Sequence, residues 1–259
     1  MRRTLALVLV AIGAASCAAR MFVPPTGPGA AAPEAAAAWD EATKECRTVT
    51  SFAPTLRLGG KVSGRSVPGL TVLGAVTADG GIRLQATGGG RTIFELAGTN
   101  DRATFYSRED NKVAIARAEE LVDALVGLKL GADALLPILT GCVTRGESVS
   151  RGERYGDLLA VATPTSRVFL QRERSGWRAR YADVQGLAVQ YTNWEQAAWP
   201  REIRIAAQRG TPSEVRLTLR IDEGPIVNPA LGPATFALNV PSTATPMTLD
   251  ELRDLLRSR

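Results

Sequence analysis

The chain of 259 residues contains no histidine. This absence excludes Ser-His-Asp and Cys-His nucleophile arrangements, as well as zinc sites with histidine ligands. It also removes the side chain that most often serves as a general base near neutral pH. Carboxylates are present, but no pair of them stands out as an acid–base motif. We therefore expect no catalytic residue, no enzymatic activity and no cofactor.

Long apolar runs are also scarce. Nothing after the N-terminus approaches the eighteen uninterrupted apolar residues that indicate a membrane-spanning helix. The apolar run over residues 5–15 is too short to cross a bilayer core of ~30 Å. It follows Arg2 and Arg3 and ends in small residues, a combination typical of an export signal. We interpret residues 1–16 as a signal peptide that is cleaved.

Cys17 stands directly after these small residues. Small residues followed by cysteine resemble the lipobox of bacterial lipoproteins, although Ala14 replaces the usual leucine. The resemblance implies a lipid on the thiol and an acyl chain, such as palmitate, on the new N-terminus. Two or three acyl chains attach a protein stably to a membrane. We predict lipidation at Cys17; the alternative is an ordinary signal peptide that happens to end near a cysteine.

The segment after Cys17 has little to bury. Residues 18–34 contain four prolines and two glycines, a composition that predicts a flexible segment. The chain thus divides into a signal peptide (1–16), a lipid-anchored flexible linker (17–35) and a single domain (36–259). Cleavage would lower the formal net charge from +5 to about +3, because the signal carries two arginines and no acid. No basic block with interleaved aromatic residues is present, so we expect no nucleic-acid partner.

Cys46 and Cys142 remain as an even pair for an oxidising compartment. Three cysteines do not suffice for a thiolate metal site once Cys17 is acylated, so we expect no metal. A bridge between Cys46 and Cys142 would close a loop of about 95 residues, worth up to ~4–5 kcal/mol. We predict this disulfide; the alternative is two buried free thiols.

Apolar periodicity predicts the order of the elements. Alanine-rich residues 33–49 are typical of a helix with Trp39 on its apolar face. A meander of short strands follows from residue 56 to 116, separated by glycine-rich turns. Two central helices come next, over 118–128 and from Asp133 to Gly141, and a second meander with clean alternation runs from 177 to 221. A final helix begins with the capping box of Thr248 and Glu251.

These strands each have one apolar face, which must be covered. A strongly curved antiparallel sheet wrapped over the central helices would cover it and leave an aliphatic cleft suited to an acyl chain. The alternative is an interior filled entirely by side chains. The candidate cleft residues are Leu70, Val72, Leu84, Leu96, Leu121, Leu125, Leu135, Leu139, Trp177, Tyr181, Ile203, Ile205, Leu217 and Leu219.

Three features follow one another on this lipobox chain: Trp39, the strand over 56–64 and the segment over 134–141. In this order they resemble the LolA/LolB group of lipoprotein carriers and receptors. The resemblance covers about residues 36–245 and is nearest to the LolB-like receptor branch. It implies a mainly β, α+β fold in which a strongly curved antiparallel sheet forms an open, unclosed β-barrel lidded by helices. The receptor has an apolar residue in the loop after its third strand, whereas the matching turn over 87–91 has none. The resemblance implies a lipoprotein that binds acyl chains in its cleft and accepts or carries lipoproteins or lipids in the periplasm. The turn over 87–91 gives no support for transfer to the membrane, but another lipid-binding role does not depend on it.

The resemblance also implies location and partners. Ala18 follows Cys17, and the lack of aspartate at this second position favours the outer membrane, facing the periplasm. The implied partners are the membrane through the N-terminal lipid, the acyl chains of lipoproteins or lipids, and a periplasmic carrier protein. An alternative function is a structural or assembly lipoprotein that uses the sheet as a docking platform. Its partner surface would be the outward arginines, Arg178, Arg180, Arg204, Arg216 and Arg220.

Overall fold

The computed structural model describes residues 21–194, 198–222 and 224–257. The predicted signal peptide and Cys17 lie outside these residues. Four helices are present: α1 (Ala35–Thr43), α2 (Ala118–Val126), α3 (Ala132–Thr140) and α4 (Leu249–Arg257). None of the helices within the described ranges is long and apolar enough to cross a membrane.

The rest of the structure is dominated by β-strands. The first half of the chain contributes β1 (Ala30–Ala31), β2 (Ser51–Ala53), β3 (Thr55–Val62), β4 (Arg65–Thr77), β5 (Gly81–Gly88), β6 (Arg91–Thr99), β7 (Ala103–Ser107) and β8 (Lys112–Ala116). The second half contributes β9 (Arg151–Tyr155), β10 (Leu158–Ala162), β11 (Ser166–Glu173), β12 (Gly176–Val184), β13 (Leu187–Thr192), β14 (Glu202–Ala207), β15 (Val215–Ile221), β16 (Ile226–Val227) and β17 (Thr245–Pro246).

The strands form two antiparallel meanders, β3–β8 and β9–β15, that join in one sheet. The junction is the antiparallel pair β15–β3, which runs from Val215 opposite Val62 to Ile221 opposite Leu56. β1 extends the β9 edge, and β17 pairs in parallel with β8 at the other edge. Among the described strands no pairing joins these two edges, so the sheet is curved but unclosed. The predicted open barrel is confirmed.

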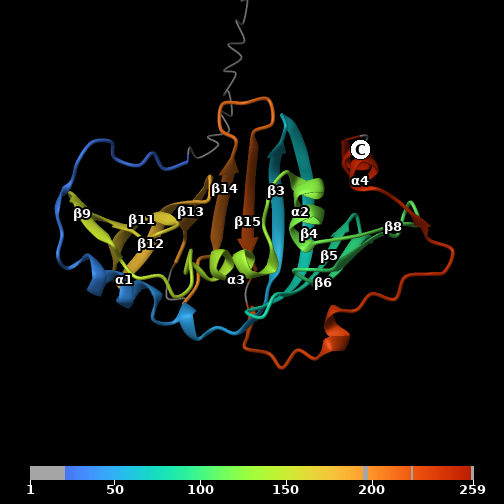
Figure 1. The fold of residues 1–259 in the computed structure, drawn as a ribbon, viewed down its shortest axis with the longest axis horizontal. Helices are drawn as coiled ribbons and strands as arrows, with labels where there is room; N and C mark the ends of the chain where they lie inside the picture. The colour runs from blue at the N-terminus through green and yellow to red at the C-terminus, as the bar shows by residue number, and fades with distance from the viewer. Residues whose placement is uncertain (1–20, 195–197, 223, 258–259) are drawn as a thin grey trace, which may run out of the picture.

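The helices connect and cover the two meanders. Figure 1 shows α2 and α3, which link β8 to β9, in front of the central strands; α3 contacts β4 and β5, and α2 contacts β7 and β8. Gly127 and Gly141 end these helices with left-handed φ angles of 71° and 78°, a conformation that glycine adopts without a steric penalty. α1 packs on β9–β12, and its Trp39 is only 2% exposed. The sheet therefore has an inner face, which the helices cover, and an outer face.

The N-terminal segment differs from the prediction. Residues 21–34 do not form a free tether, because Met21 and Phe22 pack on the outer face of the sheet. The Phe22 amide donates to the side chain of Gln190 over 2.8 Å, and the Phe22 ring lies 5.5 Å from that of Tyr181. The segment then pairs with β9 and leads into α1 on the inner face (Figure 1). It thus wraps around the β9 edge of the sheet, and the prediction of a flexible linker is wrong for these residues.

Candidate functional site

The interior between sheet and helices is lined by the predicted cleft residues. All of them except Tyr181 either belong to one hydrophobic cluster or pack against it. Several are fully buried: Leu96, Leu121 and Ile203 have no measurable exposure. The deepest part of the interior is therefore a packed core rather than an empty cavity. A ligand has to enter where the packing is less complete.

Tyr181 lies on the opposite face, and the prediction for it is wrong. Phe169 on β11 stands opposite Tyr181, but the next residue, Leu170, stands opposite Ala179. This β-bulge places Arg180 as an extra residue in β12, and an extra residue reverses the alternation beyond it. Tyr181 consequently packs on the outer face against Phe22, whereas Ala179 stays in the core.

A row of leucines on the inner face is only half-buried. Leu219, Leu58 and Leu70 stand directly opposite one another across β15, β3 and β4. Leu125 on α2 and Leu135 on α3 are also half-buried and pack against the same cluster. We name these five residues the leucine strip. They form apolar surface beneath and beside the lid helices that is still partly open to solvent.

The lid lies close to the strip. A side chain at Gly127, at the end of α2, would meet Val215 on β15 at 3.1 Å, so the helix end approaches the sheet closely. Each lid helix has nine residues, and isolated helices of this length are marginal in water. Their position therefore depends on packing against the sheet. Displacing them would enlarge the apolar surface around the leucine strip.

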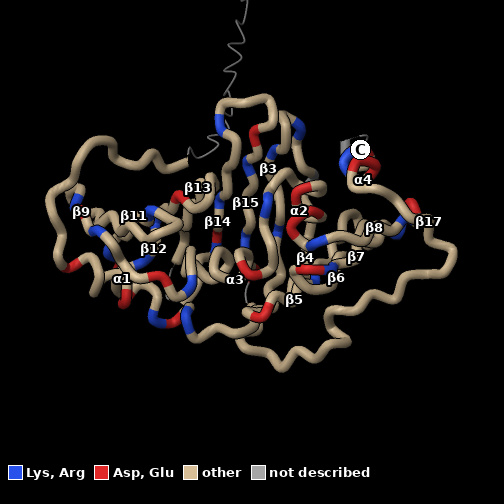
Figure 2. Tube along the Cα trace, in the orientation of Figure 1, with Lys and Arg blue, Asp and Glu red and all other residues tan. Residues whose placement is uncertain are grey.

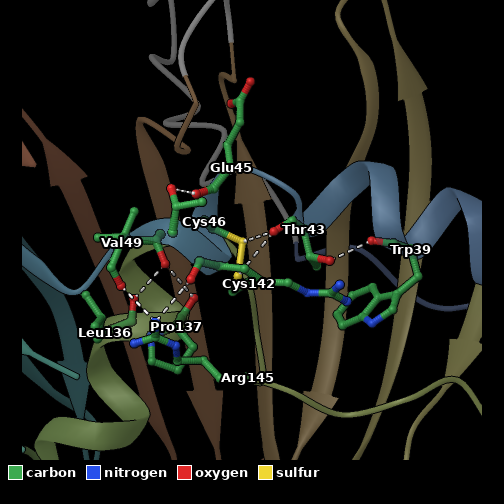
Figure 3. The surroundings of a disulfide bond; sticks show 12 residues. Trp39, Thr43, Glu45, Cys46, Val49, Leu136, Pro137, Cys142 and Arg145 are labelled. Atoms are coloured by element: carbon green, nitrogen blue, oxygen red, sulfur yellow. Dashed lines mark hydrogen bonds between the residues drawn. A yellow bond between two sulfur atoms is a disulfide. The ribbon is translucent and has the colours of Figure 1, made fainter. Parts of the chain in front are cut away.

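A disulfide holds the segment after α3. Cys46 and Cys142 are bonded, with their Cα atoms 5.6 Å apart. Figure 3 shows Arg145 just beyond this bond, and its Nη2 donates to the backbone oxygen of Val49 over 2.9 Å. These two links fix residues 142–147 against the turn that follows α1.

The segment fixed in this way forms one wall of a polar pocket that the sequence did not indicate. The pocket has a volume of about 330 Å³ and lies where α2 and α3 meet the β10–β11 and β12–β13 turns. Glu147 lies in its wall and accepts a hydrogen bond from Thr165 Oγ1 over 2.6 Å. Burial raises the pKa of the Glu147 carboxyl, but hydroxyls including those of Thr163 and Thr165 outweigh this and lower it. Glu147 is therefore an anion at neutral pH.

The predicted arginine surface is only partly present. Arg178 is buried, with its guanidinium 3.9 Å from Glu45 and 5.8 Å from the centre of the Trp194 ring, so its assignment to the solvated face is wrong. Its neighbourhood, where the chain after α1 covers the start of β12, excludes solvent. Arg204 and Arg220 both bind the buried Glu202. Figure 2 shows both charge signs mixed over the chain rather than one-sign patches.

One solved structure shares this fold, and others match more weakly. A LolA superfamily protein from Nitrosomonas europaea matches with a TM-score of 0.52 at 10% identity, over 79% of this chain and 97% of that one. A DUF1329 family protein from Desulfovibrio piger matches with a TM-score of 0.48 at 9% identity, over 78% and 96%. The lipoprotein LppX from Mycobacterium tuberculosis matches with a TM-score of 0.33 at 14% identity, over 77% and 98%.

No protein-family profile and no curated protein sequence matches the chain. The TM-scores of the second and third structures are low, so the comparison rests on the first. Its identity of 10% relates the two proteins by fold alone. The chain has a LolA-like fold: an open antiparallel barrel with helices across its inner face.

Proposed function

We propose that this protein is an outer-membrane lipoprotein, anchored through Cys17 and facing the periplasm, that binds the acyl chains of lipoproteins or other lipids. The chains would lie between the sheet and the lid helices α2 and α3. This function requires no catalytic residue and no cofactor, and we propose that the protein is not an enzyme. A periplasmic carrier protein is the partner from which such a receptor would accept its lipid.

The leucine strip is the observation that carries the proposal. Its residues pack against the core cluster yet remain partly open to solvent, and three of them are in register across adjacent strands. An acyl chain laid on them gains about 0.8 kcal/mol for each methylene that leaves water. The fold supports the same function, because the similar Nitrosomonas protein is described as a member of the LolA superfamily.

Binding also requires room, since the interior beside the strip is filled. Leu121 on α2 and Leu139 on α3, which are 0% and 3% exposed, fill it. An entering chain would replace the contacts of these residues with contacts of its own. We therefore expect α2 and α3 to move away from β3 and β4 when a ligand binds.

A titration with a fluorescent fatty acid tests the proposal. The protein would be the full mature chain with Cys17→Ser, which removes the lipid acceptor. Leu135→Asp and Leu70→Asp place a charge in the strip, and we expect each to weaken binding at least about tenfold. Leu73→Asp is the matched control, because Leu73 lies on β4 close to Leu70 but is 47% exposed. Equal binding by all folded variants would contradict the proposal.

A further inference from the structure

The polar pocket beside α3 holds charges of both signs that are left without ion pairs. Its wall includes the basic residues Lys129 and Arg145 and the acidic residues Glu119, Asp133 and Glu147. None of these five takes part in an ion pair with another residue in the described part of the chain. Elsewhere, charged side chains such as Arg204 and Glu202 are paired.

Three buried polar atoms in the wall of this pocket lack a hydrogen bond. Thr144 Oγ1, Arg145 Nη1 and Glu147 Oε2 are shielded from solvent and have no hydrogen bond of good geometry among the described residues. The hydroxyls of Thr144 and Thr163 are near enough to the Glu147 carboxylate to lower its pKa. Leaving such an atom unsatisfied costs about 1–3 kcal/mol, and more when the group is charged. Only two further side-chain atoms in the described ranges share this condition, so most of these atoms are concentrated in the wall of one pocket.

The two charged side chains are held in place by their other atoms. Arg145 uses Nη2 to bind the backbone oxygens of Val49 and Arg47, at 2.9 and 3.3 Å. Glu147 uses Oε1 to accept from Thr165. Each group is thus fixed on one side, while the atom on its other side has no partner. Both atoms are shielded from solvent, so a guest would reach them by displacing part of the pocket wall. Such an arrangement is preorganised for a ligand.

The backbone just before these two residues is strained. Val143, also in the pocket wall, has a φ angle of 64°, and a β-branched residue is rarely found in this left-handed region. The disulfide at Cys142 and the hydrogen bond from the Val143 amide to Pro137 hold it there. Strain of this kind concentrates at functional sites.

The pocket adjoins the apolar core. Ile138, Val184 and Leu187 belong both to its wall and to the hydrophobic cluster against which the leucine strip packs. A molecule with a polar head and an apolar tail could therefore place the head in the pocket and the tail against the interior. A volume of about 330 Å³ suits a small polar group.

We propose that this pocket binds a zwitterionic phosphoethanolamine head group, with a phosphate oxygen at Arg145 Nη1 and the ammonium at Glu147 Oε2. A purely anionic head would leave the buried Glu147 oxygen unpartnered, and a purely cationic head would leave the Arg145 nitrogen unpartnered. A head that carries both charges satisfies the two atoms together. The presence of acyl chains on the ligand rests on the proposed function, whereas recognition of the head does not.

Short-chain lipids test this inference on the full mature chain with Cys17→Ser. We expect dihexanoyl phosphatidylethanolamine to bind at least about fivefold more tightly than dihexanoyl phosphatidylglycerol. Glu147→Gln should abolish this preference, because it removes the charge that faces the ammonium. Arg145→Lys should weaken both lipids, since it removes the fixed Nη1 donor. Glu214→Gln, at an exposed ion pair with Arg216, is the matched control and should leave the preference unchanged.

Glycerophosphoethanolamine, which has no acyl chain, separates the two proposals. Its binding, followed by calorimetry and weakened by Glu147→Gln, would support the head-group site even if no lipid tail binds. Tail binding without any preference between the two head groups would overturn the inference and leave the proposed function standing. A preference that persists in folded Glu147→Gln would also overturn it. Thermal unfolding of each variant identifies any that fail to fold.

Discussion

Two tyrosines show how much depends on the partner of a single hydroxyl. Tyr181 donates to Asp183 over 2.8 Å, and burial together with this bond raises its pKa to about 12. The hydroxyl of Tyr191 is buried without a hydrogen-bond partner among the described residues, and burial raises its pKa as well. One hydroxyl is satisfied and the other is not.

We predict that removing these two hydroxyls has opposite effects on the free energy of unfolding. Tyr191→Phe deletes an unsatisfied group, so the free energy of unfolding should stay the same or rise by up to about 1 kcal/mol. Tyr181→Phe deletes a hydrogen bond to a charged group and should lower it by about 1–2 kcal/mol. Urea unfolding of both variants measures this, and a larger loss for Tyr191→Phe would show that its hydroxyl has a partner.

Glu202 is a buried carboxylate held between two arginines. Its oxygens accept from Arg204 Nε at 2.8 Å and from Arg220 Nε at 2.9 Å. Burial raises the pKa of Glu202, but these hydrogen bonds outweigh burial, so the pKa lies below its ordinary value of 4.5. A carboxyl whose pKa is lower in the folded state stabilises the fold above the unfolded pKa, and this contribution is lost as the pH falls through the folded value.

We therefore expect Glu202→Gln to destabilise the protein by about 1–3 kcal/mol at pH 7. The difference between wild type and variant should shrink as the pH falls below about 4.5. Urea unfolding at pH 7 and pH 3 provides both values. A difference that is the same at both pH values would contradict the role given to the ionised carboxylate.

At the scale of elements, the segment before β1 acts as an outer strap. Phe22 contacts the rings of Tyr181 and Phe169, whereas the adjacent Val23 is 81% exposed. We predict that Phe22→Ala releases residues 21–29 from the sheet, and that Val23→Ala does not. Hydrogen exchange at the Phe22 amide, which donates to Gln190, should rise at least about tenfold only in the first variant. Equal exchange in both would mean that the ring does not hold the strap.

The disulfide joins two elements that are distant in sequence. It links the turn after α1 to the end of α3 across 96 residues. Replacing both cysteines with alanine should lower the free energy of unfolding by about 2–5 kcal/mol. Reduction of the wild-type protein should have an effect of similar size, and denatured non-reduced protein should offer neither thiol for labelling. Two reactive thiols would exclude the bond.

Apolar alternation in the sequence predicted some strands correctly and left others undetected. β15 alternates cleanly because the helices cover one face and solvent contacts most of the other. β13 and β14 are buried on both faces, but their sequences still alternate because polar residues such as Gln190 and Arg204 occupy outward positions. β10 was missed because its residues Leu158–Ala162 form an unbroken apolar run. Both of its faces are covered: Leu159 and Val161 face the core, while Ala160 lies in the outer cluster beneath the strap. β10 carries apolar residues on both faces, so its sequence shows no alternation.

At the scale of the whole molecule, long-range contacts account for what sequence patterns could not show. The strap looks flexible in composition, but it is ordered by Gln190, 168 residues away. The polar pocket draws its wall from the region of α2 and α3, the loop after α3 and two strand turns. Neither arrangement leaves a local signal. The leucine strip was largely predicted, because each of its strands carries its own apolar alternation.

The central claim is that this open barrel holds an acyl chain against the leucine strip. Native mass spectrometry of the full mature chain with Cys17→Ser, purified from cells without detergent, tests it most directly. We predict a one-to-one complex whose added mass is that of an acyl lipid, and loss of this complex in Leu135→Asp but not in Leu73→Asp. A folded protein that shows only its own mass, and that also fails to take up added lipid, would contradict the claim.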